Sequence, residues 1–168
     1  MKQYIGTKLV EAEEAVKYAT FSGRTMVKAM DEDWTSEEAE MLDAGACAER
    51  GYRVRYADGY ESWSPKHVFE AAYMPLSFNE NLRSDKPSIS AEMVEAFIAD
   101  VEVQTLGTKT TLVRAILRNG FEIVEASSCV SEENYDVEIG CEVCMKKIRD
   151  KVWMLLGFLL QTAVKGVK

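Results

Sequence analysis

The strongest constraint on this chain is an apolar pattern near its carboxyl end. The residues that recur there at steps of four and three are Val137, Cys141, Cys144, Ile148, Val152, Leu155 and Leu159. This spacing places them on one side of a helix, which we predict to run from Tyr135 to Val164. Cys141 and Cys144 then lie within the apolar stripe, where thiols act as small packing residues more readily than as a redox or metal pair.

Composition excludes some classes of function. A chain of 168 residues can form one large domain or two small ones without disulfides. The net charge of -8 disfavours binding to polymeric nucleic acid, which needs a cationic surface. The first residues do not resemble a secretory signal, so we expect a cytoplasmic protein with reduced cysteines. The most apolar stretch, Val152 to Leu160, is shorter than the roughly 20 residues of a membrane span, so no membrane is expected.

A segment rich in turn-forming residues lies between Pro75 and Pro87 and marks a boundary between two modules. We therefore predict an N-terminal accessory module, residues 1–76, and a second module, residues 88–168. The expected fold class is α+β, with an antiparallel sheet and packed helices in each module and the long C-terminal helix in the second.

Local signals in the first module predict several elements. Residues 4–10 are typical of a strand, and Thr35-Ser36-Glu37-Glu38 has the spacing of a capping box before a helix that ends near Gly45. Asp58-Gly59 between alternating segments 53–56 and 60–63 predicts a hairpin. Ser64 and Pro65 suit the cap and first position of a helix that runs to about Tyr73.

In the second module, Ser90 is a suitable cap for a helix over residues 91–100. Residues 101–105 and 110–117 are rich in β-branched side chains and predict two strands. Asn119-Gly120 then favours a tight turn into a third strand at 121–124.

Signs of catalysis are few. His67 is the only histidine, and in an amphipathic helix it is more typical of a packing or surface residue than of a general base. The four cysteines lack the paired loop spacing of zinc sites, and no Gly-rich phosphate loop occurs. We therefore expect no enzyme, no catalytic residue, no metal and no cofactor.

The long helix leaves two interpretations open. Lys146, Arg149 and Trp153 follow one another by three and four, so they either form a solvated face, with a Glu142–Lys146 ion pair, or a phosphate-binding surface. Residues 154–160 are apolar on nearly every side. Either a second copy of the chain or the first module could cover that surface.

An ordered set of motifs resembles a known family. The motifs are Val101-Glu102-Val103-Gln104-Thr105, Leu117-Arg118-Asn119-Gly120-Phe121, Ser128-Cys129-Val130, Asn134-Tyr135-Asp136 and Arg149-Asp150-Lys151-Val152-Trp153. Together they resemble the gp forty-nine/gp sixty-six family of small phage proteins. The order of helix, antiparallel strands, Asn-Gly turn and long helix is also similar to the Thoeris anti-defence sponge proteins of phages. The first module resembles segments of phage and prophage proteins of unassigned role.

The resemblance to the sponges implies a specific activity. Such a protein would be a Thoeris inhibitor that sequesters cyclic ADP-ribose isomers, and in some members cyclic oligonucleotides, within a homo-oligomer, a hexamer built as a trimer of dimers. The candidate ligand-binding residues are Phe121, Asn134, Asp136, Arg149, Arg114 and Lys146. Phe121 could stack on a base, Asn134 and Asp136 could hydrogen-bond base or ribose, and the cations could meet phosphates. Phe121 could equally be a core residue, and Asn134 or Asp136 could cap the long helix.

The hypothesis is thus nucleotide sequestration without degradation. Its first rival is a phage accessory protein that binds and inhibits a host protein through the acidic first module, in particular through residues 31–43. The second rival is a small nucleotide-processing enzyme with scattered carboxylates and a metal.

Overall fold

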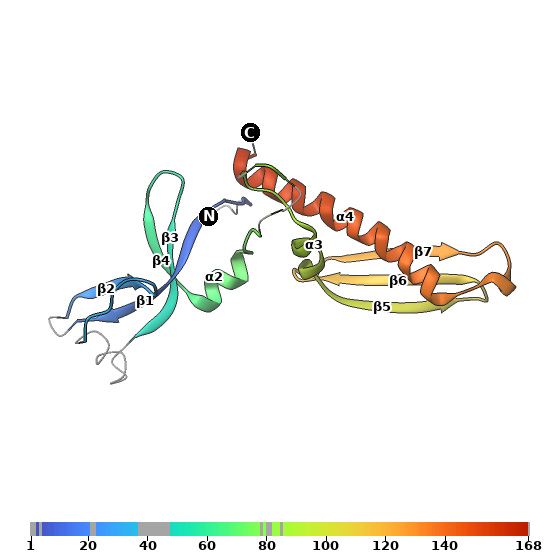
Figure 1. The fold of residues 1–168 in the computed structure, drawn as a ribbon, viewed down its shortest axis with the longest axis horizontal. Coiled ribbons are helices and arrows are strands. Elements are labelled where there is room, and N and C mark those ends of the chain that lie inside the picture. Colours follow the sequence, from blue (N-terminus) through green and yellow to red (C-terminus); the bar gives the residue numbers. More distant parts are fainter. Residues whose placement is uncertain are drawn as a thin grey trace. The chain divides into compact units, whose positions relative to one another are not determined.

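The computed structural model describes residues 3, 5–20, 23–36, 48–77, 79, 82–84 and 86–167. The chain divides into two compact units, Lys8–Pro75 and Leu76–Lys168, with the first seven residues grouped with the second. Each unit carries its own antiparallel sheet and at least one helix, so the predicted α+β class is confirmed (Figure 1).

The N-terminal unit is a four-stranded sheet with the order β2-β1-β3-β4. Its elements are β1 (Glu11–Ala19), β2 (Thr25–Ala29), β3 (Glu49–Arg55), β4 (Glu61–Pro65) and α2 (Lys66–Ala72). The predicted hairpin is confirmed as β3 and β4, and Gly59 in its turn adopts φ 83°, which a residue with a Cβ rarely does.

Several expectations for this unit need correction. The strand expected at residues 4–10 is wrong where the structure describes it, because the first paired strand begins at Glu11. β1 and β2 were not anticipated, since Glu and Ala in β1 are poor strand formers and only cross-strand pairing makes that segment extended. Pro65 rather than Ser64 occupies the N-cap position of α2, and no side chain caps this helix. The helix expected from the capping box near Thr35 lies outside the described residues beyond Ser36.

The two faces of this sheet differ. On one face, Tyr52 of β3 stacks on Phe69 of α2 with ring centroids 4.2 Å apart, and Phe69 stacks on Tyr73 at 4.7 Å. These contacts hold α2 against the sheet through Phe69, which is half-buried, while no residue of α2 is fully buried. The opposite face carries charged residues of β1, β3 and β4, because alternate residues of a strand point to opposite sides.

The C-terminal unit is one long helix packed on a three-stranded sheet with the order β5-β6-β7. Its elements are α3 (Ala91–Phe97), β5 (Ile98–Leu106), β6 (Thr110–Leu117), β7 (Glu122–Ser128), the short 3-10 helix η1 (Glu132–Asn134) and α4 (Val137–Lys165). The predicted strands, turn and long helix are confirmed. Ser90 caps α3 by accepting from Met93 N at 3.2 Å, but α3 ends at Phe97 because Ile98 already belongs to β5.

The core of this unit lies between α4 and one face of the sheet. Burial alternates along β6, so that its odd-numbered residues, among them Val113 and Ala115, are fully covered. The buried residues of α4 are Gly140, Cys144, Ile148, Val152 and Leu156. This row steps by four throughout, which inclines it to the helix axis and suits a helix that crosses a twisted sheet.

The predicted stripe of α4 is therefore only partly right. Cys144, Ile148 and Val152 are buried as expected. Val137 and Leu159 are instead about two-fifths exposed and Cys141 is half-buried, because a strict step of four rotates the contact line around the helix and leaves these positions beside it.

Candidate functional site

Phe121 follows the Asn119-Gly120 turn at one end of the three-stranded sheet. Its backbone is fixed, because its N–H donates to Asn119 Oδ1 at 3.1 Å and its carbonyl accepts from Leu117 N at 2.8 Å. Its side chain is 55% exposed, so in this chain the ring is not a core residue. An exposed ring on a rigid turn is able to stack on a flat ligand.

Asn134 and Asp136 lie at the opposite end of the sheet, where α4 begins. Asp136 Oδ1 accepts from Glu138 N at 2.8 Å and from Ile139 N at 3.2 Å, so this carboxylate is the N-cap of α4. The carbonyl of Asn134 accepts from Cys129 Sγ at 3.4 Å, while its side chain is exposed. Capping thus engages Asp136 and leaves the Asn134 amide available.

Tyr135 joins this end of α4 to the sheet. Its hydroxyl lies 2.7 Å from Thr105 Oγ1 and 3.1 Å from Thr111 Oγ1. Thr111 is fully buried beneath Gly140, where a Cβ would lie 2.2 Å from Thr111 Oγ1. The start of α4 is therefore held to β5 and β6 by a close backbone approach and a short hydrogen-bond network.

The two cations predicted on α4 differ in how they are engaged. Arg149 Nε donates to Glu95 Oε1 at 2.5 Å, which ties α4 to α3, and both side chains are about half exposed. Lys146 is exposed, and the structure, which describes both residues, contains no ion pair between it and Glu142. The predicted Glu142–Lys146 pair is therefore wrong, and the Lys146 ammonium faces solvent.

Arg114 lies on the face of the sheet that points away from α4. Its Nε and Nη2 donate to both oxygens of Glu122 at 2.9 and 2.5 Å, and its Nη1 donates to Glu102 at 2.8 Å. These bonds raise the pKa of the guanidinium and lower the pKa of the Glu122 carboxyl. Arg114 is thus held by two carboxylates and could meet a phosphate only by exchanging one of them.

The structure brings some of the predicted residues together and separates others. Phe121 and Arg149 lie toward α3, since Arg118 N of the same turn donates to Phe97 O and Arg149 reaches Glu95. Asn134 and Asp136 lie at the far end of β6, beside Thr111. Arg114 lies on the outer face. The six residues therefore do not line one cavity within a single copy of this unit.

Sequence reasoning missed the carboxylates that partner these cations. The three-dimensional structure identifies these carboxylates as Glu95, Glu102 and Glu122. The pairing register, in which Glu102 lies opposite Arg114, could have been derived from the tight connection at Gly107 between β5 and β6. No comparable signal links Arg149 with Glu95, which are far apart in sequence.

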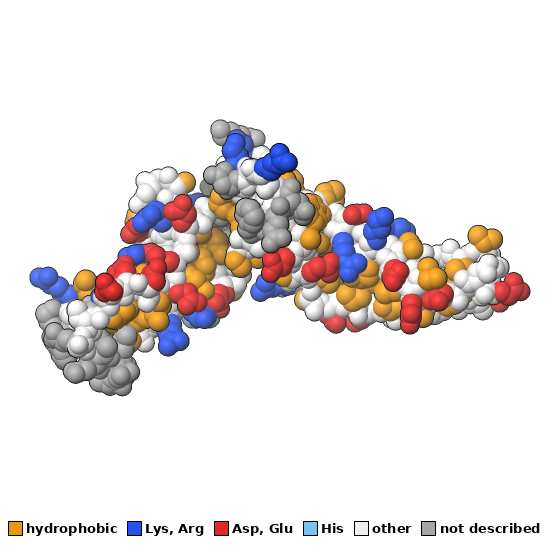
Figure 2. Space-filling model, viewed as in Figure 1, with side chains coloured by type: hydrophobic (Ala, Val, Ile, Leu, Met, Phe, Trp, Pro, Cys, Tyr) orange, Lys and Arg blue, Asp and Glu red, His pale blue; other side chains and the backbone are white. Residues whose placement is uncertain are grey.

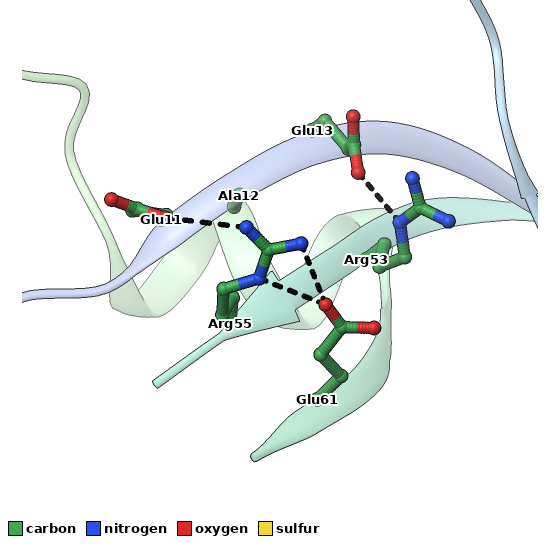
Figure 3. A pocket seen from close by; sticks show the side chains of 6 residues that line it. All are labelled: Glu11, Ala12, Glu13, Arg53, Arg55 and Glu61. Atoms are coloured by element: carbon green, nitrogen blue, oxygen red, sulfur yellow. Dashed lines mark hydrogen bonds and ion pairs between the residues drawn. The ribbon is translucent and has the colours of Figure 1, made fainter. Parts of the chain in front are cut away.

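A shallow depression lies on the charged face of the N-terminal sheet (Figure 3). Arg55 lies between Glu61 at 2.8 Å and Glu11 at 3.8 Å, and Arg53 binds Glu13 at 2.6 Å. Arg53 also contacts Glu32 at 2.8 Å, and these carboxylates raise the pKa of its guanidinium. Four carboxylates thus surround two guanidiniums, and the face is acidic.

The cysteines give no sign of a shared site. Cys144 is fully buried, and burial raises the pKa of its thiol, while Cys141 and Cys129 are half-buried. Cys47 lies outside the described residues. Over the described ranges, no group of three or more His, Cys, Asp or Glu side chains is placed to hold a metal ion.

Acidic and basic side chains are interspersed over the visible surface of both units (Figure 2).

The C-terminal unit is thus a small α+β module in which one helix covers one face of an antiparallel sheet. Residues 89–164 match the Phage protein (N4 Gp49/phage Sf6 gene 66) family. The predicted phage family is thereby confirmed. No curated protein and no solved structure matches the chain. None of the helices in the described part of the chain has the length and apolar character that a bilayer span requires.

Proposed function

We propose that this phage protein is an anti-defence sponge, which binds a cyclic nucleotide immune signal in the host cytoplasm and withholds it without breaking it. The proposal rests on the resemblance to the Thoeris anti-defence sponges, with cyclic ADP-ribose isomers as the first ligand class and cyclic oligonucleotides as the second. A sponge needs tight, pre-organised binding and no transition-state machinery. Homo-oligomerisation, as a hexamer built from dimers, belongs to the same proposal.

The observation that supports it most is the exposed Phe121 ring on its rigid turn. A base that stacks on such a ring is bound without loop ordering, which lowers the entropic cost of binding. Arg149, whose forked guanidinium suits a phosphate, extends from α4 toward the same end of the unit. Because Phe121 and Asn134 lie at opposite ends of the sheet, a site that uses both would be completed by a second copy.

Calorimetry with a panel of cyclic ADP-ribose isomers tests the role of the ring. Loss of one stacking contact costs about 1–3 kcal/mol, so Phe121→Ala should weaken binding about 5- to 150-fold. Val130→Ala is the matched control, because Val130 is 96% exposed at the other end of the unit. Equal affinities for Phe121→Ala and the wild type would remove Phe121 from the site.

The charged part of the site predicts two opposite effects. Arg149→Ala should weaken binding, because it removes the phosphate donor. Glu95→Gln should strengthen binding, because it removes the carboxylate that competes with phosphate for Arg149. If both variants weaken binding, Arg149 acts by holding α4 to α3 rather than by contacting the ligand.

The acidic face of the N-terminal sheet favours a second candidate, an accessory protein that binds and inhibits a basic host protein. Glu11 is 82% exposed and has only one long contact, so Glu11→Lys reverses its charge without breaking the fold. Loss of protection from host defence in Glu11→Lys, with Phe121→Ala fully active, would favour this candidate over the sponge. The part of the acidic segment beyond Ser36 lies outside the described residues.

A further inference from the structure

The sheet of the C-terminal unit has two edges, and only one of them is blocked. Along β7, Lys147 Nζ donates to the backbone carbonyl of Ala126 at 3.2 Å, and Lys147 and Lys151 both contact Glu125. These two lysines of α4 place positive charge beside β7, and lysines at an edge strand hinder another strand from pairing with it. The β7 edge is therefore partly blocked against further strand addition.

The β5 edge is open over the described residues. β5 pairs with β6 on one side, and no described segment pairs with its other side, as Figure 1 also shows. At nine residues it is long for an edge strand. Helix α4 packs over β6 and β7, so Val103, which points to the α4 face opposite buried Val113, remains 42% exposed. An exposed long edge with an apolar residue at its middle is a surface for strand addition.

We propose that β5 pairs antiparallel with β5 of a second copy, around a two-fold axis at Val103. Charge selects this register. A two-fold axis at Val101 would place Asp100 opposite Glu102 of the partner, and an axis at Glu102 would place Glu102 opposite itself; like charges directly opposite are destabilising. With the axis at Val103, Glu102 lies opposite Gln104, Val101 opposite Thr105 and Val103 opposite Val103.

This register also preserves the two faces of the sheet. Odd-numbered residues of β5 face α4, and in this pairing they meet only odd-numbered residues of the partner. The apolar α4 face therefore continues across the junction, and the two α4 helices lie on the same side. The paired strands span Asp100 to Leu106, the longest overlap that avoids opposed carboxylates.

Disulfide trapping tests the register directly. Directly opposed residues of an antiparallel pair lie about 4.5–5.5 Å apart at Cα, within the range of a disulfide. Val103→Cys should therefore give, on mild oxidation without nucleotide, a species of twice the 18.9 kDa chain mass that maps to a 103–103 linkage. Val124→Cys is the matched control, since Val124 is 51% exposed on the blocked strand and should give no such linkage.

A second pair of variants measures the assembly without oxidation. Val103→Lys should halve the mass in sedimentation, because two lysines would lie opposite each other, whereas Val124→Lys should leave it unchanged. A wild-type chain that sediments as a single copy, or an assembled Val103→Cys chain that forms no 103–103 linkage, would overturn the proposal. Because no nucleotide enters either experiment, the two experiments test the β5 pairing separately from ligand binding: a failed 103–103 linkage in an assembled chain removes this interface and leaves the sponge proposal standing.

Discussion

Gly140 is a position at which the backbone of α4 lies very close to the sheet. A Cβ there would lie 2.2 Å from Thr111 Oγ1 and 2.7 Å from Thr111 Cβ, and Thr111 is fully buried. Overpacking lowers the free energy of unfolding by about 1–3 kcal/mol, while the better helix propensity of alanine over glycine raises it by about 1 kcal/mol. We therefore expect Gly140→Ala to lower the free energy of unfolding by up to about 2 kcal/mol in urea titrations.

Gly157 is the matched control for this prediction. It lies in the same helix, but a Cβ there meets nothing within 4 Å. Gly157→Ala should therefore raise the free energy of unfolding by about 1 kcal/mol. Similar shifts for the two variants would contradict the close approach of α4 to Thr111.

Cys144 differs from the other described cysteines in reactivity. It is fully buried, and burial raises the pKa of its thiol, so less of the reactive thiolate exists at neutral pH. Alkylation of the native protein, followed by mass spectrometry, should label Cys129 and Cys141 well before Cys144. Early labelling of Cys144 would show that its side of α4 is not packed against the sheet.

At the scale of elements, α4 depends on its N-cap. Asp136→Ala should destabilise the C-terminal unit by about 1 kcal/mol, because two backbone N–H groups lose their acceptor. Asp136→Ser keeps a capping oxygen and should retain most of that stability. If Asp136→Ser instead abolishes ligand binding while remaining stable, the carboxylate has a role in the site beyond capping.

The ion pairs across the sheet predict a dependence of stability on pH. Arg114 lowers the pKa of Glu122, and Lys151 lowers the pKa of Glu125, below the ordinary value of 4.5. The stabilisation is therefore present above about pH 4.5 and is lost as the pH falls through the lowered values. Because Arg114, Glu122 and Lys151 are each at least one-third exposed, the effect should be small, and Glu122→Gln should flatten the acid side of the stability curve measured by urea titration.

Elements specified by local signals could be predicted from the sequence. The Ser90 cap, the Asn119-Gly120 turn and the apolar periodicity of α4 each act within a few residues of the chain. β1 could not be predicted in this way, because its Glu- and Ala-rich sequence becomes a strand only by pairing with β2 and β3. The same limit applies to the site, where Arg114 and Arg149 find carboxylates supplied by other elements.

At the scale of the whole molecule, the central claim is capture without conversion. Native mass spectrometry of the full chain, mixed with a panel of cyclic ADP-ribose isomers and cyclic oligonucleotides, reports the assembly and the bound mass together. The account predicts an oligomer that carries one of these ligands and releases it on heating with its mass unchanged. An assembly that binds no compound of the panel, or that releases a compound of altered mass, would contradict it.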